Sequence, residues 1–406
     1  MSHPTVTFEV MSGPHLGERL KFDAHDTFLV GRSLTAQLKL LEDKHFSRNH
    51  LRIEVKPPRC YLVDLESSNG TFVNGERVSD VWLSDGDTIS GGRTEILVRI
   101  QDDAGNIEIE TAEYDQFNPA LAMTMVPETL ALPKNVLHYD ILGELGAGSM
   151  GIVYRAKCRK TDREVALKLI SPVTRVDDRA LKTFVREGQV LRRLDHKRIV
   201  RFIETGVFNR RLFLAMEYVP AIDLEATLGE LKFPERVRVA CGVMRQALDG
   251  LSHAHDLNMI HRDVKPKNLL VSRSDGKLHV KLADFGLAKN YMDAGMSQIS
   301  GENEIKGTLN FMAPEQVINC RHAKPQADIF SAGATLYSLI TGETIYDLSD
   351  RRTPLAAVLN GGPIPIESRV EIDPALAAVV GKSLAPDVAD RYQSANEMRS
   401  ALRLFV

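Results

Sequence analysis

No stretch of this sequence is apolar over the roughly 20 residues that a helix needs to cross a bilayer. The longest apolar runs, such as residues 375–380, are far shorter. The first residues, Met-Ser-His-Pro, show no basic segment followed by an apolar one, so no signal peptide is indicated. Only four cysteines occur, without paired spacing, which argues against a disulfide framework or a zinc site. We therefore expect a cytoplasmic protein with reduced thiols and no membrane span.

An excess of charge of either sign is also missing. The 406 residues carry 51 Lys and Arg against 54 Asp and Glu, a formal net charge of −3. A chain so balanced gives no sign of a broad nucleic-acid or membrane surface. Its length suggests two to three domains.

The charge is unevenly distributed, and this divides the chain into three parts. Residues 1–102 hold 12 basic and 15 acidic residues, and residues 103–136 hold one basic and six acidic residues. The middle part also has three prolines and little periodicity, so it is interpreted as an acidic, flexible linker. The remaining part, residues 137–406, carries a net charge of +5.

Short strands dominate the first part. Residues 5–10, 51–55 and 95–100 alternate between apolar and polar with a period of two, and turn signals such as Asn69-Gly70 separate them. This pattern predicts an all-β sandwich. Residues 137–406 begin with strand-like segments and become rich in helical periodicity, for example over residues 180–194, 237–255 and 375–384.

A glycine-rich loop lies near the start of the last part. Residues 146–153 read Gly-Ala-Gly-Ser-Met-Gly-Ile-Val. Glycines let backbone N–H groups approach phosphate oxygens closely. Alone, the loop is weak evidence, because a dinucleotide-binding turn or an ordinary glycine-rich loop has the same pattern.

Four further motifs decide between these alternatives. Residues 165–168 read Val-Ala-Leu-Lys, residues 261–268 His-Arg-Asp-Val-Lys-Pro-Lys-Asn, residues 284–286 Asp-Phe-Gly and residues 313–315 Ala-Pro-Glu. With these motifs in order, the chain resembles the eukaryotic-type serine/threonine protein kinase superfamily, and its bacterial members in particular. The resemblance implies a bilobal α+β kinase fold for residues 137–406.

The resemblance also implies which residues carry phosphoryl transfer, a reaction that depends on positioning and charge neutralisation. Asp263 would accept or orient the proton of the attacking hydroxyl. Asn268 and Asp284 would hold two Mg²⁺ ions, with Mn²⁺ as a substitute. Lysine at position 265 marks serine/threonine rather than tyrosine kinases. The catalytic residues implied are Lys168, Glu187, Asp263, Lys265 and Thr308.

The implied ATP site combines the glycine loop, the lysine strand and a hinge. The hinge begins with the gatekeeper Met216, followed by Glu217 and Val219, whose backbone groups would bind adenine. Asp223 matches an acidic residue that contacts ribose. The full set is Leu145, Gly146, Gly148, Gly151, Val153, Ala166, Lys168, Met216, Glu217, Val219 and Asp223.

Structural and regulatory positions follow from the same resemblance. Asp328 is expected to be a buried acid that supports the catalytic loop, and Arg391 is expected to pair with Glu315. Ser297 and Ser300 are candidate regulatory phosphosites, because a phosphate there could pair with the arginine that precedes Asp263 and order the loop.

The N-terminal part has motifs of its own. Residues 31–32 read Gly-Arg, residues 47–50 Ser-Arg-Asn-His and residues 67–75 Ser-Ser-Asn-Gly-Thr-Phe-Val-Asn-Gly. On these residues it resembles a forkhead-associated (FHA) domain, a phosphothreonine-binding β-sandwich. The resemblance implies a dianion site on loops, served by charge-assisted hydrogen bonds. The implied phosphothreonine-binding residues are Arg32, Ser47, Arg48, Ser68 and Asn69, while His50 and Asn74 are expected to brace the loops.

Together these motifs predict an ATP-dependent serine/threonine protein kinase with protein substrates and a reader of phosphothreonine peptides. The reader would recruit phosphorylated substrates, or it would dock on the chain's own linker, where Thr111, Thr124 and Thr129 are candidates. One alternative is a phosphopeptide-binding scaffold whose kinase fold is inert. Another, a small-molecule phosphotransferase, is disfavoured by the Ala-Pro-Glu segment.

Overall fold

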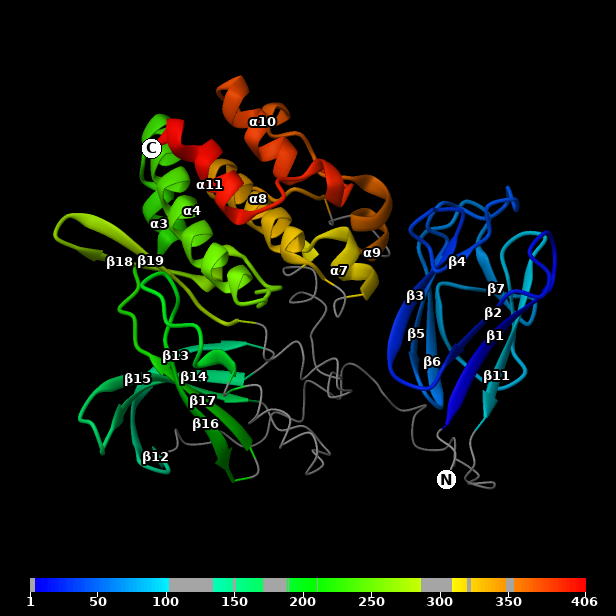
Figure 1. Ribbon diagram of the computed structural model, residues 1–406, viewed down its shortest axis with the longest axis horizontal. Helices are drawn as coiled ribbons and strands as arrows, with labels where there is room; N and C mark the ends of the chain where they lie inside the picture. Colours follow the sequence, from blue (N-terminus) through cyan, green and yellow to red (C-terminus); the bar gives the residue numbers. More distant parts are fainter. Residues whose placement is uncertain are drawn as a thin grey trace.

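The computed structural model describes residues 4–101, 134–148, 151–170, 188, 190–209, 211–285, 309–319, 323–347 and 354–406. Along the chain these residues form a β-sandwich, a small antiparallel sheet and a helical lobe (Figure 1). We call them the reader domain (residues 4–101), the N-lobe (residues 134–217) and the C-lobe (residues 218–406).

The reader domain consists of two packed sheets, with strand orders β2-β1-β11-β10-β7-β8 and β4-β3-β5-β6-β9. All strand pairs are antiparallel except β3 with β4, and a shared apolar core lies between the sheets. The predicted sandwich is thus confirmed, and the three alternating segments fall in β1, β5 and β11. The strands are β1 (Thr5–Ser12), β2 (Arg19–Phe22), β3 (Asp26–Gly31), β4 (Leu38–Lys39), β5 (Leu51–Lys56), β6 (Arg59–Asp64), β7 (Thr71–Val73), β8 (Glu76–Val78), β9 (Asp80–Leu83), β10 (Thr88–Ser90) and β11 (Glu95–Gln101).

The N-lobe is one twisted antiparallel sheet with the order β12-β13-β14-β15-β17-β16. Alternate residues such as Tyr154, Ala156, Leu167 and Phe213 fill its core. The strands are β12 (Asn135–Val136), β13 (Tyr139–Gly148), β14 (Gly151–Cys158), β15 (Glu164–Ile170), β16 (Phe202–Phe208) and β17 (Arg211–Glu217). Of the predicted helix over residues 180–194, only residue 188 and residues 190–194 are described, and Gly188, Val190 and Leu191 are helical.

Helices build the C-lobe around the largest apolar core of the protein. Two of the predicted helices are confirmed as α4 and α10. The elements are α3 (Leu224–Gly229), α4 (Phe233–Asp256), η2 (Pro266–Asn268), β18 (Leu269–Ser274), β19 (Lys277–Leu282), α7 (Pro314–Asn319), α8 (Pro325–Thr341), α9 (Pro354–Ala356), η5 (Ala357–Gly361), η6 (Ile366–Ser368), α10 (Pro374–Ser383), η7 (Val388–Asp390), α11 (Ala395–Ala401) and η8 (Leu402–Phe405).

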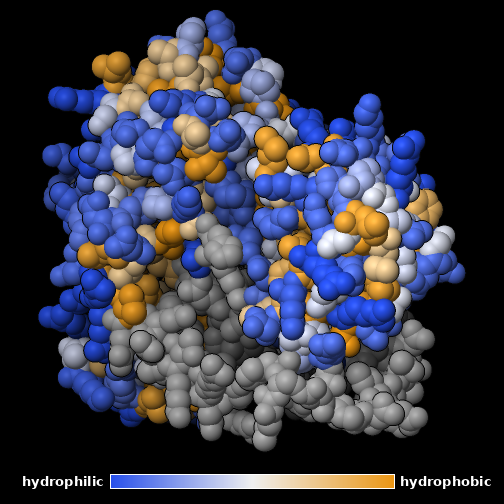
Figure 2. All heavy atoms as spheres, turned by 45° about the vertical axis from the view of Figure 1, so that its right-hand side comes forward, coloured by the Kyte–Doolittle hydropathy of each residue, from blue (hydrophilic) through white to orange (hydrophobic). Residues whose placement is uncertain are grey.

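One face of the molecule shows how apolar residues are distributed on its surface. On the face drawn in Figure 2 the described surface is largely hydrophilic, with hydrophobic residues in small separate groups. Within the described ranges, the structure contains no helix that combines the length and the hydrophobicity needed to span a bilayer.

Candidate active site

Residues 261–268, which we call the catalytic loop, lie between helix α4 and the β18–β19 hairpin. Helix α4 ends at Asp256, the loop follows, and β18 and β19 then pair in antiparallel register. Leu269 lies opposite Leu282, so the residues just outside the hairpin, Asn268 and Ala283, also meet: the Ala283 N–H donates to the Asn268 carbonyl at 2.9 Å. The register of one short hairpin therefore brings the end of the catalytic loop beside Asp284.

Two lysine–carboxylate pairs form the centre of this site. Lys168 Nζ on β15 lies 2.8 Å from Asp284 Oδ2, although 116 residues separate them in sequence. Lys265 Nζ lies 3.0 Å from Asp263 Oδ2. Lys168 is only 7% exposed, so this ion pair is largely shielded from water on the lysine side. The structure thus brings together four of the side chains that the sequence singled out.

Asn268 completes the group. Its amide nitrogen donates to the Asp263 carbonyl at 2.7 Å and to Asp263 Oδ2 at 3.1 Å. These bonds fix which way the amide points and leave its oxygen as the acceptor of this side chain. Together with the Asp284 carboxylate, it offers the hard oxygen ligands that Mg²⁺ prefers.

A buried acid supports the catalytic loop from below. Asp328 on α8 is fully buried and accepts hydrogen bonds from the backbone N–H groups of His261 and Arg262, at 2.8 and 2.7 Å. Burial alone would raise the pKa of this carboxyl, but the hydrogen bond from the His255 ring and the loop N–H groups lower it below its usual value. Asp328 therefore stays ionised, as expected of a residue that supports the loop.

The His261 ring is structural. It is fully buried, its Nε2 lies 2.9 Å from the Ala283 carbonyl, and its ring contacts Phe285 at 4.4 Å. Desolvation by burial lowers the pKa of this imidazole, so it is neutral and donates to Ala283. The histidine thus ties the catalytic loop to the segment that carries Asp284.

The glycine loop is the β13–β14 hairpin, whose strands pair up to Gly148 opposite Gly151. Gly151 has a φ of +132°, and a Cβ there would lie 1.9 Å from the Leu169 carbonyl oxygen, so only glycine fits. Ala166 lies opposite Met216 in the β15–β17 pair, which joins the lysine strand to the hinge.

The hinge carries contacts that the motifs did not reveal. The Glu217 carboxylate lies 2.9 Å from Lys281 Nζ on β19, so an ion pair links the hinge to the C-lobe. Asp223, expected to contact ribose, accepts a hydrogen bond from the Ala226 N–H and caps α3. Its role toward ATP stays a prediction.

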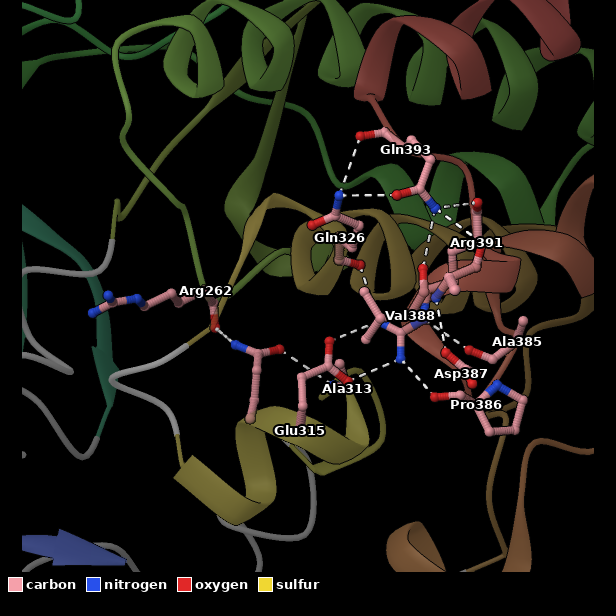
Figure 3. A network of polar contacts seen from close by, with 12 residues as sticks. Arg262, Ala313, Glu315, Gln326, Ala385, Pro386, Asp387, Val388, Arg391 and Gln393 are labelled. Atoms are coloured by element: carbon pink, nitrogen blue, oxygen red, sulfur yellow. Dashed lines mark hydrogen bonds and ion pairs between the residues drawn. The ribbon is translucent and has the colours of Figure 1, made fainter. Parts of the chain in front are cut away.

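The Ala-Pro-Glu segment is held by a buried arginine, as expected. Arg391 makes a bidentate pair with Glu315 at 2.7 and 2.9 Å and donates to the carbonyls of residues 385, 386 and 326 (Figure 3). Next to it, the Gln316 amide donates to the Arg262 carbonyl at 3.1 Å. Helix α7 and the catalytic loop are therefore fixed to each other.

Several predicted residues lie outside the described part of the chain. These are the catalytic candidates Glu187 and Thr308, the phosphosite candidates Ser297 and Ser300, and the linker threonines Thr111, Thr124 and Thr129.

The predicted phosphothreonine residues lie on three loops at one end of the reader domain. The Ser47 hydroxyl lies 3.4 Å from the Ser68 hydroxyl and accepts from the Ser68 N–H at 3.0 Å. The Asn69 amide donates to the His45 carbonyl, and Arg32 Nε donates to the Phe46 carbonyl. Arg48 is exposed beside them. The structure therefore gathers these residues around one loop junction.

Two residues set the shape of this junction. A Cβ on Gly31 would lie 2.3 Å from the Arg48 carbonyl oxygen, so glycine is required where β3 passes the loop. His50 is fully buried, and its Nδ1 accepts from the Ser47 N–H at 3.0 Å while its Nε2 faces the Gly70 carbonyl at 3.3 Å. His50 thus braces two loops at once, as expected.

The buried His50 predicts that the reader domain loses stability in mild acid. Burial lowers the pKa of His50 below its usual value of 6.5. Between pH 6.5 and the lowered pKa, His50 is therefore protonated in the unfolded state but neutral in the folded state. The free energy of unfolding should fall by up to about 1.4 kcal/mol per pH unit from pH 6.5 down to the folded pKa. Fluorescence of Trp82, the single tryptophan, reports urea unfolding of this domain alone. If a His50→Gln variant showed the same dependence of unfolding free energy on pH as the wild type, His50 would not be the group responsible.

Comparison with known families agrees with this geometry. Residues 139–401 match the family model described as the protein kinase domain, which is more than half of the chain. The chain belongs to the protein kinase family. Residues 28–92 match the FHA domain model, so the chain joins an FHA domain to a kinase domain.

Curated relatives match the chain over the kinase domain. The chain is 33% identical over 266 residues to the serine/threonine-protein kinase PknL of Mycobacterium tuberculosis, covering 65% of this chain and 64% of PknL. It is 32% identical over 263 residues to the probable serine/threonine-protein kinase PknB of Lactococcus lactis, covering 64% of this chain and 40% of PknB. This chain therefore spans between two fifths and two thirds of the length of these two relatives.

Solved structures agree as well. A double mutant of the Mycobacterium tuberculosis PknI kinase domain superposes with a TM-score of 0.53 at 27% identity, covering 68% of this chain and 99% of that domain. The unmutated PknI kinase domain gives a TM-score of 0.51 at 26% identity. The bilobal kinase fold expected from the motifs is thereby confirmed.

Proposed function

We propose that this chain is a serine/threonine protein kinase that transfers the γ-phosphate of ATP to hydroxyl groups of proteins. The observation that carries the proposal is the pairing of Lys168 with Asp284 and of Asn268 with Asp263 at one place in the fold, where the Ala283 N–H donates to the Asn268 carbonyl and so joins the two pairs. Phosphoryl transfer needs such a set, because the protein must align the attacking and leaving oxygens and neutralise the charge on the phosphoryl group.

Each residue has a distinct part in this proposal. Lys168 binds the α- and β-phosphates, and Asp263 orients the attacking hydroxyl and accepts its proton. Lys265, which already lies 3.0 Å from Asp263, stabilises charge on the transferred group. The Asp284 carboxylate and the Asn268 amide oxygen would hold Mg²⁺, or Mn²⁺ in its place, which would neutralise charge on the phosphates.

The reader domain supplies the second half of the function. Arg32, Ser47, Ser68 and Asn69 present charged or polar hydrogen-bonding groups at one loop junction, which suits the dianionic phosphate of phosphothreonine. Its ligand is a phosphorylated protein substrate, or the chain's own linker, which the candidate threonines make available. An inert scaffold would keep this binding and lose phosphate transfer.

The boundaries proposed are residues 1–102 for the reader, 103–136 for the linker and 137–406 for the kinase domain. The cytoplasm is the compartment that supplies ATP to such an enzyme. Cys60, Cys158 and Cys241 are buried and free, which suits a reducing environment.

Transfer of the γ-phosphate from labelled ATP to a generic protein substrate tests the proposal. The wild type should phosphorylate serine and threonine when Mg²⁺ is present. Lys168→Met should lose at least about 10²-fold in kcat, because a positioned charge that stabilises the transition state is worth that much. Lys160→Met, a matched change at an exposed turn, should keep full activity. A wild type without transfer would leave the scaffold as the better function.

A further inference from the structure

An apolar contact joins the reader domain to the C-lobe. Leu29 and Leu65 are both 0% exposed, yet they belong to a cluster separate from the sandwich core. Their neighbours in that cluster include Ala356 of α9, Ile318 of α7 and Leu359 of η5. Figure 1 shows β3 on the side of the reader that faces α7 and α9.

The position of Leu29 in its strand shows that it serves this contact. Phe28 and Val30 point into the sandwich core, so Leu29 between them lies on the opposite face of the sheet. The outer face of an antiparallel sheet normally faces water and carries polar side chains. Here Leu29 is fully buried, in a cluster that Ala36 and Leu65 of the reader form together with Ala356 of the C-lobe.

Three asparagines add polar contacts to the same interface. The Asn360 amide donates to the Leu65 carbonyl at 3.1 Å, and the Asn49 amide donates to Asn360 Oδ1 at 3.2 Å and to the Leu359 carbonyl at 3.0 Å. At the far end of β3, the Asn319 amide donates to Asp26 Oδ1 at 2.6 Å. The contact therefore has fixed geometry as well as apolar area.

Asn360 holds the bases of two phosphothreonine loops at once. Asn49 lies two residues after Ser47, and Leu65 lies three residues before Ser68. A hydrogen bond of 2.9 Å from the Leu65 N–H to the His50 carbonyl ties the two loop bases together. Asn360 contacts this tied pair from outside, while Arg32, Ser68 and Asn69 remain exposed.

We propose that the C-lobe is part of the phosphothreonine reader, with Asn360 as a positioning residue that preorganises the two loops for a phosphothreonine peptide. The inference rests on the proposed reading function. Loops already held in their binding geometry lose less freedom when ligand binds, so docking raises affinity. By linkage, a bound phosphopeptide strengthens the contact between reader and C-lobe by the same factor.

The test measures binding of a degenerate phosphothreonine peptide library to the full chain. Asn360→Ala removes two hydrogen bonds at an exposed residue, so the fold should survive, and the dissociation constant should rise about threefold to tenfold. Asn360→Asp keeps an acceptor for Asn49 but turns a carboxylate toward the Leu65 carbonyl, so it should weaken binding at least as much. Asn396→Ala, a matched change at an exposed site on α11, should bind like the wild type.

Arg32→Ala separates the two levels of the proposal. If Arg32→Ala binds as tightly as the wild type, the reading function itself is wrong. If Arg32→Ala loses binding while both Asn360 variants keep wild-type affinity or exceed it, reading stands and the role of the C-lobe is overturned. Unchanged thermal melting of the Asn360 variants, together with weaker binding, separates positioning from general destabilisation.

Discussion

Asp263→Asn is expected to lower kcat by about 10²- to 10⁴-fold, the range over which a positioned general base contributes. The asparagine fills the same volume and can still accept from the Asn268 amide, but it cannot take a proton from the attacking hydroxyl. It also removes the charge that holds Lys265 at 3.0 Å. The measurement is the rate of phosphate transfer at saturating ATP and protein substrate, with ATP affinity measured separately.

A matched carboxylate controls for the loss of one negative charge. Asp275 is exposed in the turn between β18 and β19, with a φ of +50°, a conformation that asparagine adopts readily. Asp275→Asn should therefore leave kcat and ATP affinity unchanged. Equal rates for the two variants would show that Asp263 has no part in the chemistry, and the catalytic assignment would have to move to another group.

The catalytic residues were predictable because their motifs are local in sequence, whereas their contacts depend on long-range packing. The motif from His261 to Asn268 can be recognised from eight consecutive residues. The resemblance assigned Lys168 and Asp284 to one site, but it did not predict their direct contact, which depends on strand pairing and the β18–β19 register across 116 positions. Sequence periodicity carries no information on such a register.

The sequence contains an indication of the interdomain contact, but it does not identify the partner. Residues 28–30 are apolar without interruption and all buried, whereas the neighbouring strand β5 alternates between apolar and polar residues. Such a run indicates that both faces of the strand are covered. It cannot indicate by what, because the partners Ala356 and Leu359 are more than 300 residues away and Asn360 belongs to no motif. Only the folded structure shows that the C-lobe is part of the cover.

Asp328→Asn is expected to destabilise the C-lobe by about 3 kcal/mol, because a buried group that loses its charge leaves its partners unsatisfied. The carboxylate accepts from two loop N–H groups and from the His255 ring. The asparagine has a single acceptor oxygen, and its NH₂ group must face another donor. Three kcal/mol is a large part of the 5–15 kcal/mol by which domains are typically stable. Urea unfolding followed by circular dichroism of the helical C-lobe measures the loss.

Asp328→Asn should also lower kcat, because Asp328 holds the backbone next to Asp263 in place. The Arg262 N–H donates to Asp328 while Arg262 holds a φ of +65°, a strained conformation for a residue with a long side chain. Without a full acceptor this backbone can relax and move Asp263, the next residue. Asp373→Asn replaces an exposed helix cap, where the two residue types are equivalent, so it should change neither stability nor kcat. If Asp328→Asn matched this control in both measurements, the carboxylate would not be what holds the catalytic loop in place.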